Sequence, residues 1–187
     1  TSNTSETDPY PLHNDIAIPK RSKVNSSNTI LILGNSFIGT SEIGAFLDDM
    51  LARGNTQMTC EAISRGYATV QTYTSDTYLM ETIAEGQYCY VFQCGFYRYK
   101  DAVALEEMAA ACKASNTGLV AFPAHNEQED VINMIGDVPL LNWKGEINAI
   151  IDRGVAYRDF CIDDAHQHST PLAGYVGAGL IYRAVLR

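Results

Sequence analysis

The chain has 187 residues, of which 46% are hydrophobic, with a formal net charge of −9 and an isoelectric point near 4.8. This length suffices for one buried core and is short for two ordinary domains. The negative charge repels an extended phosphate backbone, so we predict that nucleic acid is not a partner. No apolar run reaches the roughly 18 residues that a membrane-spanning helix needs, so we predict no transmembrane segment.

Residues 1–28 are rich in Ser, Thr, Asn and Pro and lack hydrophobic periodicity. This pattern predicts a flexible N-terminal tail or linker, followed by one domain over residues 29–187. Such a segment is typical of an exported protein, so we expect a periplasmic, extracellular or surface-tethered location. The odd number of cysteines, five, argues against a disulfide framework, and a cytoplasmic location therefore stays open.

Short apolar strands alternate with longer helical patterns along the rest of the chain. The strands are expected at 29–33, 57–63, 88–93, 118–122 and 156–160. The helices are expected at 41–53, 70–84, 101–114, 127–135, 144–153 and 171–186. This alternation predicts an α/β fold, a three-layer αβα sandwich with a five-stranded parallel sheet. Right-handed crossovers then place functional sites at the carboxyl ends of the strands.

Three residues that suit nucleophilic catalysis follow predicted strand ends. Ser36 comes directly after the first strand, and Asp163 and His166 stand three positions apart just before the last helix. A serine hydroxyl becomes a good nucleophile when an imidazole accepts its proton and a carboxylate fixes the imidazole tautomer. We therefore predict an acyl-transfer triad with Ser36 as nucleophile, His166 as base and Asp163 as orienting acid.

Other common site motifs are missing around this serine. The GxSxG elbow is absent because Ile38 stands in place of its second glycine. The loop at 34–39 matches neither a phosphate-binding loop nor GxGxxG, which argues against a flavodoxin-like nucleotide binder. The Asp, Glu and His residues show no spacing typical of a closed zinc site. We predict no metal and no cofactor.

The serine and histidine motifs together resemble those of the SGNH or GDSL-type hydrolases, a family of small esterases and lipases. The segment Gly34-Asn35-Ser36-Phe37 is similar to the family's first block, with Asn35 where the common form has Asp. Asp163 and His166 fall on its last block, DxxH. The resemblance covers roughly residues 29–187. It implies a flavodoxin-like sheet and a serine esterase that works through an acyl-enzyme.

The resemblance also implies residues for an oxyanion hole. Gly66 lies where the family has a glycine after the second strand, but Tyr97 occupies the position of the family's asparagine after the third. The expected donors are the amides of Ser36 and Gly66, with Gln93 or Tyr97 as a substitute side-chain donor. Gly66 is equally interpretable as a turn glycine, and Gln93 as a residue that satisfies a buried backbone group.

Two histidines precede the last helix, which leaves the identity of the base open. The spacing to Pro171 and Gly174 suits His168 about as well as His166. The DxxH spacing favours His166, because His168 would have Ala165 at the acid position. In that interpretation His168 lines the substrate cleft or caps the helix.

The substrate is expected to be a small-molecule or carbohydrate ester, with acetyl as the preferred acyl group. No apolar lid segment is visible for a long acyl chain, and the aromatic residues Phe96, Tyr97 and Tyr99 suit a sugar-binding wall. The replacement of the family asparagine by Tyr97 supports an alternative from another class, a non-catalytic binding module that retains the fold.

Overall fold

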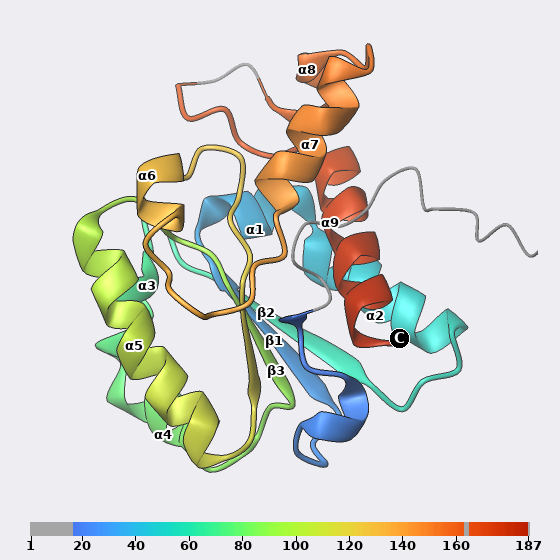
Figure 1. The fold of residues 1–187 in the computed structure, drawn as a ribbon. Helices are drawn as coiled ribbons and strands as arrows, with labels where there is room; N and C mark the ends of the chain where they lie inside the picture. The colour runs from blue at the N-terminus through green and yellow to red at the C-terminus, as the bar shows by residue number, and fades with distance from the viewer. Residues whose placement is uncertain (1–16, 163–164, 187) are drawn as a thin grey trace, which may run out of the picture.

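The computed structural model describes residues 17–162 and 165–186. Its centre is a four-stranded parallel sheet in the order β2-β1-β3-β4 (Figure 1). The strands are β1 Thr29–Gly34, β2 Thr59–Ser64, β3 Tyr90–Gln93 and β4 Gly118–Ala121. The chain runs from β1 to one edge and then crosses to β3 on the other side of β1. The strand order therefore reverses beside the carboxyl end of β1, a position where α/β sheets commonly bind ligands.

Helices cover both faces of the sheet, as Figure 1 shows. On one face lie α1 Ser36–Ser41, α2 Ile43–Arg53, α7 Trp143–Asp152, α8 Tyr157–Phe160 and α9 Pro171–Val185. On the other lie α3 Val70–Thr74, α4 Thr77–Ala84, α5 Tyr99–Ala114 and α6 Glu129–Ile132. None of these described helices is long and apolar enough to cross a membrane.

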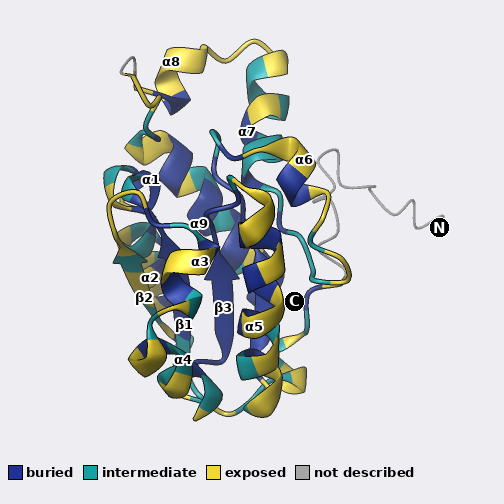
Figure 2. Ribbon diagram, turned by 90° about the vertical axis from the view of Figure 1, so that its left-hand side faces the viewer, coloured by how far each residue is buried: buried dark blue, intermediate teal, exposed yellow. Residues whose placement is uncertain are grey.

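Strand periodicity divides the core into two clusters. In β1, Ile30 and Ile32 pack on the side of α2 and α9, whereas Leu31 and Leu33 pack on the side of α3, α4 and α5, because successive strand residues point to opposite faces. The central strand β3 is buried throughout, while the edge strand β2 is largely exposed (Figure 2). The continuous apolar run in β1 therefore reflects cover on both faces.

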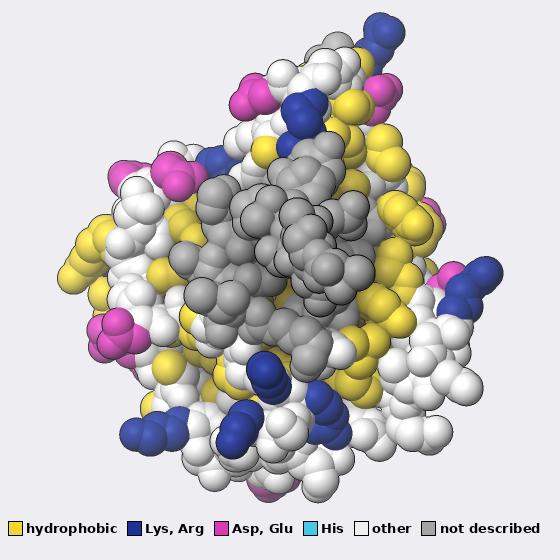
Figure 3. Space-filling view, turned by 45° about the vertical axis from the view of Figure 1, so that its right-hand side comes forward, with side chains coloured by type: hydrophobic (Ala, Val, Ile, Leu, Met, Phe, Trp, Pro, Cys, Tyr) yellow, Lys and Arg dark blue, Asp and Glu magenta, His cyan; other side chains and the backbone are white. Residues whose placement is uncertain are grey.

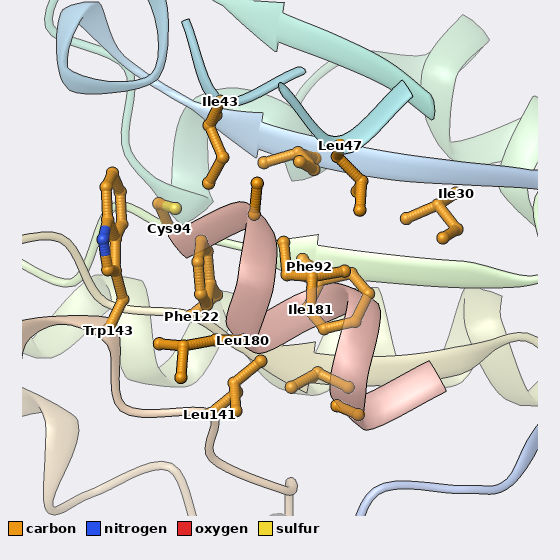
Figure 4. Packing of buried hydrophobic residues seen from close by; sticks show 14 of the residues in the cluster. Ile30, Ile43, Leu47, Phe92, Cys94, Phe122, Leu141, Trp143, Leu180 and Ile181 are labelled. Atoms are coloured by element: carbon orange, nitrogen blue, oxygen red, sulfur yellow. The ribbon is translucent and has the colours of Figure 1, made fainter. Parts of the chain in front are cut away.

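The core beneath α9 positions the segment that precedes this helix. Leu180 and Ile181 of α9 lie against Phe92 and Phe122 in Figure 4. The rings of Phe122 and Trp143 stack with centroids 5.0 Å apart, and Trp143 Nε1 donates a hydrogen bond of 2.9 Å to the backbone oxygen of Ala173. The N-terminal end of α9 is thereby held at the carboxyl rim of the sheet.

The expected fifth strand at 156–160 is wrong, because this segment contains the short helix α8. The segment at 139–141 already covers the outer edge of β4. The Ala121 backbone N–H donates to the backbone oxygen of Pro139 at 2.8 Å, and the Ala121 backbone oxygen accepts from the Leu141 N–H at 2.9 Å. The edge that a fifth strand would need is therefore occupied.

One expected helix begins slightly later than predicted, and another is divided. The expected helix at 41–53 corresponds to α2, which the separate helix α1 precedes, and Glu42 between α1 and α2 has a left-handed backbone with φ of 54°. The expected helix at 70–84 ends after α3, and Asp76 then caps α4 by accepting a hydrogen bond from the Leu79 amide. Apolar spacing continues through both breaks, so the periodicity alone does not show them.

Part of the segment assigned to the tail packs on the domain. Ile18 is only 2% exposed, and the Tyr90 hydroxyl donates to the backbone oxygen of Pro19 at 2.6 Å. Asn25 donates its side-chain amide to the backbone oxygens of Tyr88 and Ser115. The folded unit therefore includes residues 17–28 in addition to the expected domain.

Basic side chains form a small group at the lower edge of the face in Figure 3, with single ones elsewhere and Asp and Glu between them. The one basic cluster in the sequence is Lys20, Arg21 and Lys23. The Arg21 guanidinium donates to the backbone oxygens of Asn25 and Ser27 at 2.5 and 2.8 Å. Arg21 thus organises the turn that leads into β1.

Candidate active site

Ser36 lies at the carboxyl end of β1, where it begins α1. The preceding Asn35 is extended and caps this helix, with its side-chain oxygen accepting a hydrogen bond of 3.1 Å from the Phe37 amide. A side chain at Gly34 would collide with Ile38, so the close return of the helix onto the strand requires glycine there. The turn therefore presents the Ser36 hydroxyl at the point where the strand order reverses.

The Ser36 hydroxyl is in hydrogen-bond contact with His168, with Oγ 2.8 Å from Nε2. The imidazole also packs on the Phe37 ring, with centroids 5.1 Å apart. The loop that carries His168 is closed by two backbone hydrogen bonds, from Ile162 to the His168 oxygen at 2.7 Å and from Thr170 to the Phe160 oxygen at 2.9 Å. A serine hydroxyl and an imidazole nitrogen at this separation can act chemically as nucleophile and general base.

His166 occupies a different place from the one that the DxxH spacing indicates. It is exposed, and its ring lies 5.7 Å from that of His168 and 6.1 Å from that of Tyr67 between centroids. Gln167 between the histidines has a left-handed backbone with φ of 53°. The structure thus brings His168, and not His166, to the hydroxyl. The predicted acid Asp163 lies outside the described residues.

A cleft of about 740 Å³ opens around Ser36. Every loop that follows a strand contributes to it, together with the segment before α9. Representative lining residues are Ser36, Gly66, Tyr67, Tyr97, Asn126, His166 and His168. Because these loops all lie at the carboxyl ends of parallel strands, residues distant in sequence meet at one rim.

Neither a protein-family model nor a curated protein matches this sequence. Solved structures do match. The psychrotrophic esterase EstA from Pseudoalteromonas sp. superposes with a TM-score of 0.61 at 15% identity, over 84% of this chain and 96% of the esterase. A protein from Desulfitobacterium hafniense assigned to the G-D-S-L lipolytic family gives 0.53 at 11% identity, over 85% and 100%. The chain has an SGNH/GDSL hydrolase-type fold.

A third structure extends this likeness over nearly the whole chain. A protein from Bacteroides fragilis assigned as an acylhydrolase has a TM-score of 0.53 and 12% identity, over 98% of this chain and 97% of its own. The α/β class and the parallel sheet expected from the sequence are confirmed, but the sheet has four strands and not the expected five.

Within this SGNH-type fold, two backbone amides at the cleft are open donors. Ser36 and Gly66 both line the cleft, and neither backbone N–H has an acceptor among the described residues. A side chain at Gly66 would meet nothing within 4 Å, so packing does not require glycine there. The two amides are therefore free to bind a ligand oxygen.

Gln93 does not reach the cleft. It is fully buried, and its side-chain amide donates to the backbone oxygen of Cys94 at 2.7 Å. This contact corresponds to the alternative interpretation, in which Gln93 satisfies a buried backbone group.

Tyr97 lies between two amide side chains. Its hydroxyl accepts a hydrogen bond from Asn35 Nδ2 at 2.9 Å and donates one to Asn126 Oδ1 at 2.6 Å. Burial raises the pKa of Tyr97 above its ordinary value, so the phenol stays protonated. Sequence analysis missed Asn126. Its position in a loop directly after the fourth predicted strand is the signal that could have indicated it.

A buried carboxylate joins two of the loops that form the cleft. Glu127, 1% exposed, accepts backbone hydrogen bonds from Gly95 at 2.7 Å, Phe96 at 2.6 Å and Ala124 at 2.5 Å. Burial raises the pKa of Glu127 to about 7, and the three amide donors oppose this shift. The expected helix at 127–135 includes Glu127, whereas in the structure this residue precedes α6 and links the two loops.

Proposed function

We propose that this protein is a serine esterase. Ser36 Oγ attacks the ester carbonyl while His168 Nε2 accepts the hydroxyl proton. The imidazolium then returns this proton to the leaving alcohol, and an acyl-enzyme remains on Ser36. His168 next takes a proton from water, whose oxygen attacks the acyl group, and gives it back to Ser36 as the acid leaves. The observation that carries this proposal is the 2.8 Å contact between Ser36 and His168 in the cleft.

The proposed oxyanion hole includes the backbone amides of Ser36 and Gly66. A carbonyl oxygen gains negative charge as the carbon becomes tetrahedral, and fixed N–H donors stabilise that charge. The support for these two donors is that both line the cleft and neither has an acceptor among the described residues.

An orienting acid completes the proposed triad, and we retain Asp163 in this role. With His168 as base, Asp163 stands five positions before it instead of three. We expect Asp163→Asn to lower kcat of ester hydrolysis by about 10⁴-fold, because loss of the carboxylate allows the wrong imidazole tautomer. The matched variant Asp164→Asn should retain activity within about threefold. Steady-state kinetics on both variants test the assignment, and a reversed pattern would make Asp164 the acid.

The proposed substrate is a small acyl ester, with acetyl favoured, on a carbohydrate or another small alcohol. The cleft is about 740 Å³ and combines polar side chains with aromatic surfaces from Phe37, Tyr67 and Tyr97. Such surfaces suit the apolar face and hydroxyl groups of a sugar.

Hydrolysis of p-nitrophenyl acetate by the wild type and by Ser36→Ala tests the proposed function. We expect the wild type to be active, the variant to lose at least about 10³-fold, and p-nitrophenyl octanoate to be hydrolysed more slowly than the acetate. Equal activity of the two proteins would contradict the role of Ser36. No hydrolysis by the wild type of these esters or of acetylated sugars would favour the alternative, a non-catalytic binding module.

A further inference from the structure

The substitution of Tyr97 for the family asparagine raises the question of which side chain contacts the oxyanion. A phenolic hydroxyl has one hydrogen to donate. In Tyr97 this hydrogen is directed to Asn126 Oδ1 at 2.6 Å, and the same oxygen accepts from Asn35 at 2.9 Å. Tyr97 would have to break its hydrogen bond to Asn126 in order to donate to a substrate.

Asn35 is also engaged. Its side-chain oxygen accepts from the Phe37 amide at 3.1 Å, which fixes the orientation of the amide group. Its nitrogen consequently faces Tyr97 at 2.9 Å and the backbone oxygen of Ala68 at 3.4 Å. Both hydrogens of the Asn35 amide are therefore directed at protein acceptors.

Asn126 has the free donor. Because its oxygen accepts from Tyr97, its nitrogen must point away from the tyrosine, and no acceptor for this nitrogen is recorded among the described residues. Asn126 is half-buried and lines the same cleft as Ser36 and His168. The next residue, Glu127, ties this loop to the one that carries Tyr97.

We propose that Asn126 Nδ2 donates the side-chain hydrogen bond to the oxyanion, and that Tyr97 is the positioning residue that orients it. This inference rests on the proposed esterase function. The family asparagine after the third strand is thereby replaced by an asparagine after the fourth, and Tyr97 fills the original position and holds the new donor in place.

The test compares Asn126→Ala, Asn126→Asp and Tyr97→Phe with the wild type on p-nitrophenyl acetate. Active sites are first titrated with a fluorophosphonate, so that each rate refers to folded protein. We expect Asn126→Ala to lower kcat by about 10²–10³-fold with little change in KM, the effect of removing one oxyanion donor. Asn126→Asp, which keeps the shape and removes the donor hydrogens, should lose at least as much. Tyr97→Phe should lose less, about tenfold, because the donor remains but is no longer oriented.

Asn133→Ala is the matched control, since Asn133 is an exposed asparagine at the end of α6 whose side chain makes no hydrogen bond within the described part of the chain. It should retain wild-type kcat. Wild-type kcat in Asn126→Ala, measured beside an inactive Ser36→Ala, would overturn the inference and leave the esterase proposal intact. A larger loss in Tyr97→Phe than in Asn126→Ala would also overturn it, since the phenol would then be the donor. An inactive wild type would contradict the proposed function itself.

Discussion

At the residue scale, the polar groups around the candidate site fall into two kinds. Asn35 and Tyr97 are held by hydrogen bonds within the protein, whereas Ser36, Asn126 and the Gly66 amide present groups to the cleft. Buried polar groups are costly when unpaired, so the paired residues can form a rigid support. Their fixed orientation is what gives the cleft-facing groups a defined geometry before any substrate arrives.

Glu127 gives a pH-dependent prediction at this scale. Its pKa in the folded protein is about 7, above the ordinary 4.5. Because the folded state binds this proton more tightly than the unfolded state, protonation of Glu127 stabilises the folded protein. This stabilisation is fully present below pH 4.5 and is lost as the pH rises through 7. Glu127→Gln lacks this dependence. We therefore expect the free energy of unfolding of the wild type to fall relative to that of the variant between pH 5 and pH 8.

The variant should also be less stable than the wild type at pH 5, by about 1–3 kcal/mol. The glutamine amide nitrogen would face one of the three backbone donors that now bind the side-chain oxygens of Glu127, and a buried N–H would lose its acceptor. Urea titrations of both proteins at pH 5 and pH 8 measure the two effects. Parallel pH profiles would show that the carboxyl group does not titrate in this range.

At the element scale, the close approach of α9 to α1 holds the rim together. A side chain at Gly174 would overlap the backbone oxygen of Ser41, whereas one at Gly179 of the same helix would meet nothing within 4 Å. The two glycines therefore occupy the same secondary structure in opposite packing environments. Gly174 permits the close contact between α9 and α1. Gly179 only lowers the helix propensity of α9, which alanine would raise.

We expect Gly174→Ala to destabilise the protein by about 1–3 kcal/mol, because the added methyl group forces α9 away from α1. Gly179→Ala should stabilise it by about 0.5–1 kcal/mol, since glycine is a poor helix former. Urea-induced unfolding monitored by circular dichroism measures both changes. Similar effects from the two substitutions would contradict the packing described for Gly174.

The observed strands and helices show which parts of the fold can be predicted from the sequence. Apolar runs located β1, β3 and β4, because a strand covered on both faces is hydrophobic almost throughout. The run at 156–160 failed as a strand, because nothing in its own composition reveals that residues 139–141 already cover β4. The left-handed backbone of Glu42 could not be predicted either, since the apolar spacing continues on both sides of this residue.

The candidate site was predictable to a similar degree. Ser36 was indicated by its place after the first strand. His168 was weighed against His166 and set aside on spacing, yet the left-handed Gln167 and the pairing of Cys161 with Ser169 decide which ring reaches the serine. Asn126 belongs to a loop that no sequence motif identifies. Its hydrogen bond with Tyr97 depends on how the loops after β3 and β4 pack together.

At the scale of the whole molecule, the proposed chemistry depends on contacts between segments that are far apart in sequence. Ser36 and His168 are separated by 132 positions, and the sheet and α9 bring them together. The α/β fold supplies this rim whatever reaction takes place there, and structural likeness at 11–15% identity establishes the fold alone. The proposed esterase function therefore depends on the Ser36–His168 pair itself.

The rate of fluorophosphonate labelling tests this pair most directly in four proteins: the wild type, Ser36→Ala, His166→Ala and His168→Ala. We predict rapid labelling of the wild type and of His166→Ala, no labelling of Ser36→Ala, and labelling of His168→Ala slowed by at least about 10³-fold. Slow labelling of His166→Ala together with rapid labelling of His168→Ala would contradict the account, because His166 would then be the base that activates Ser36.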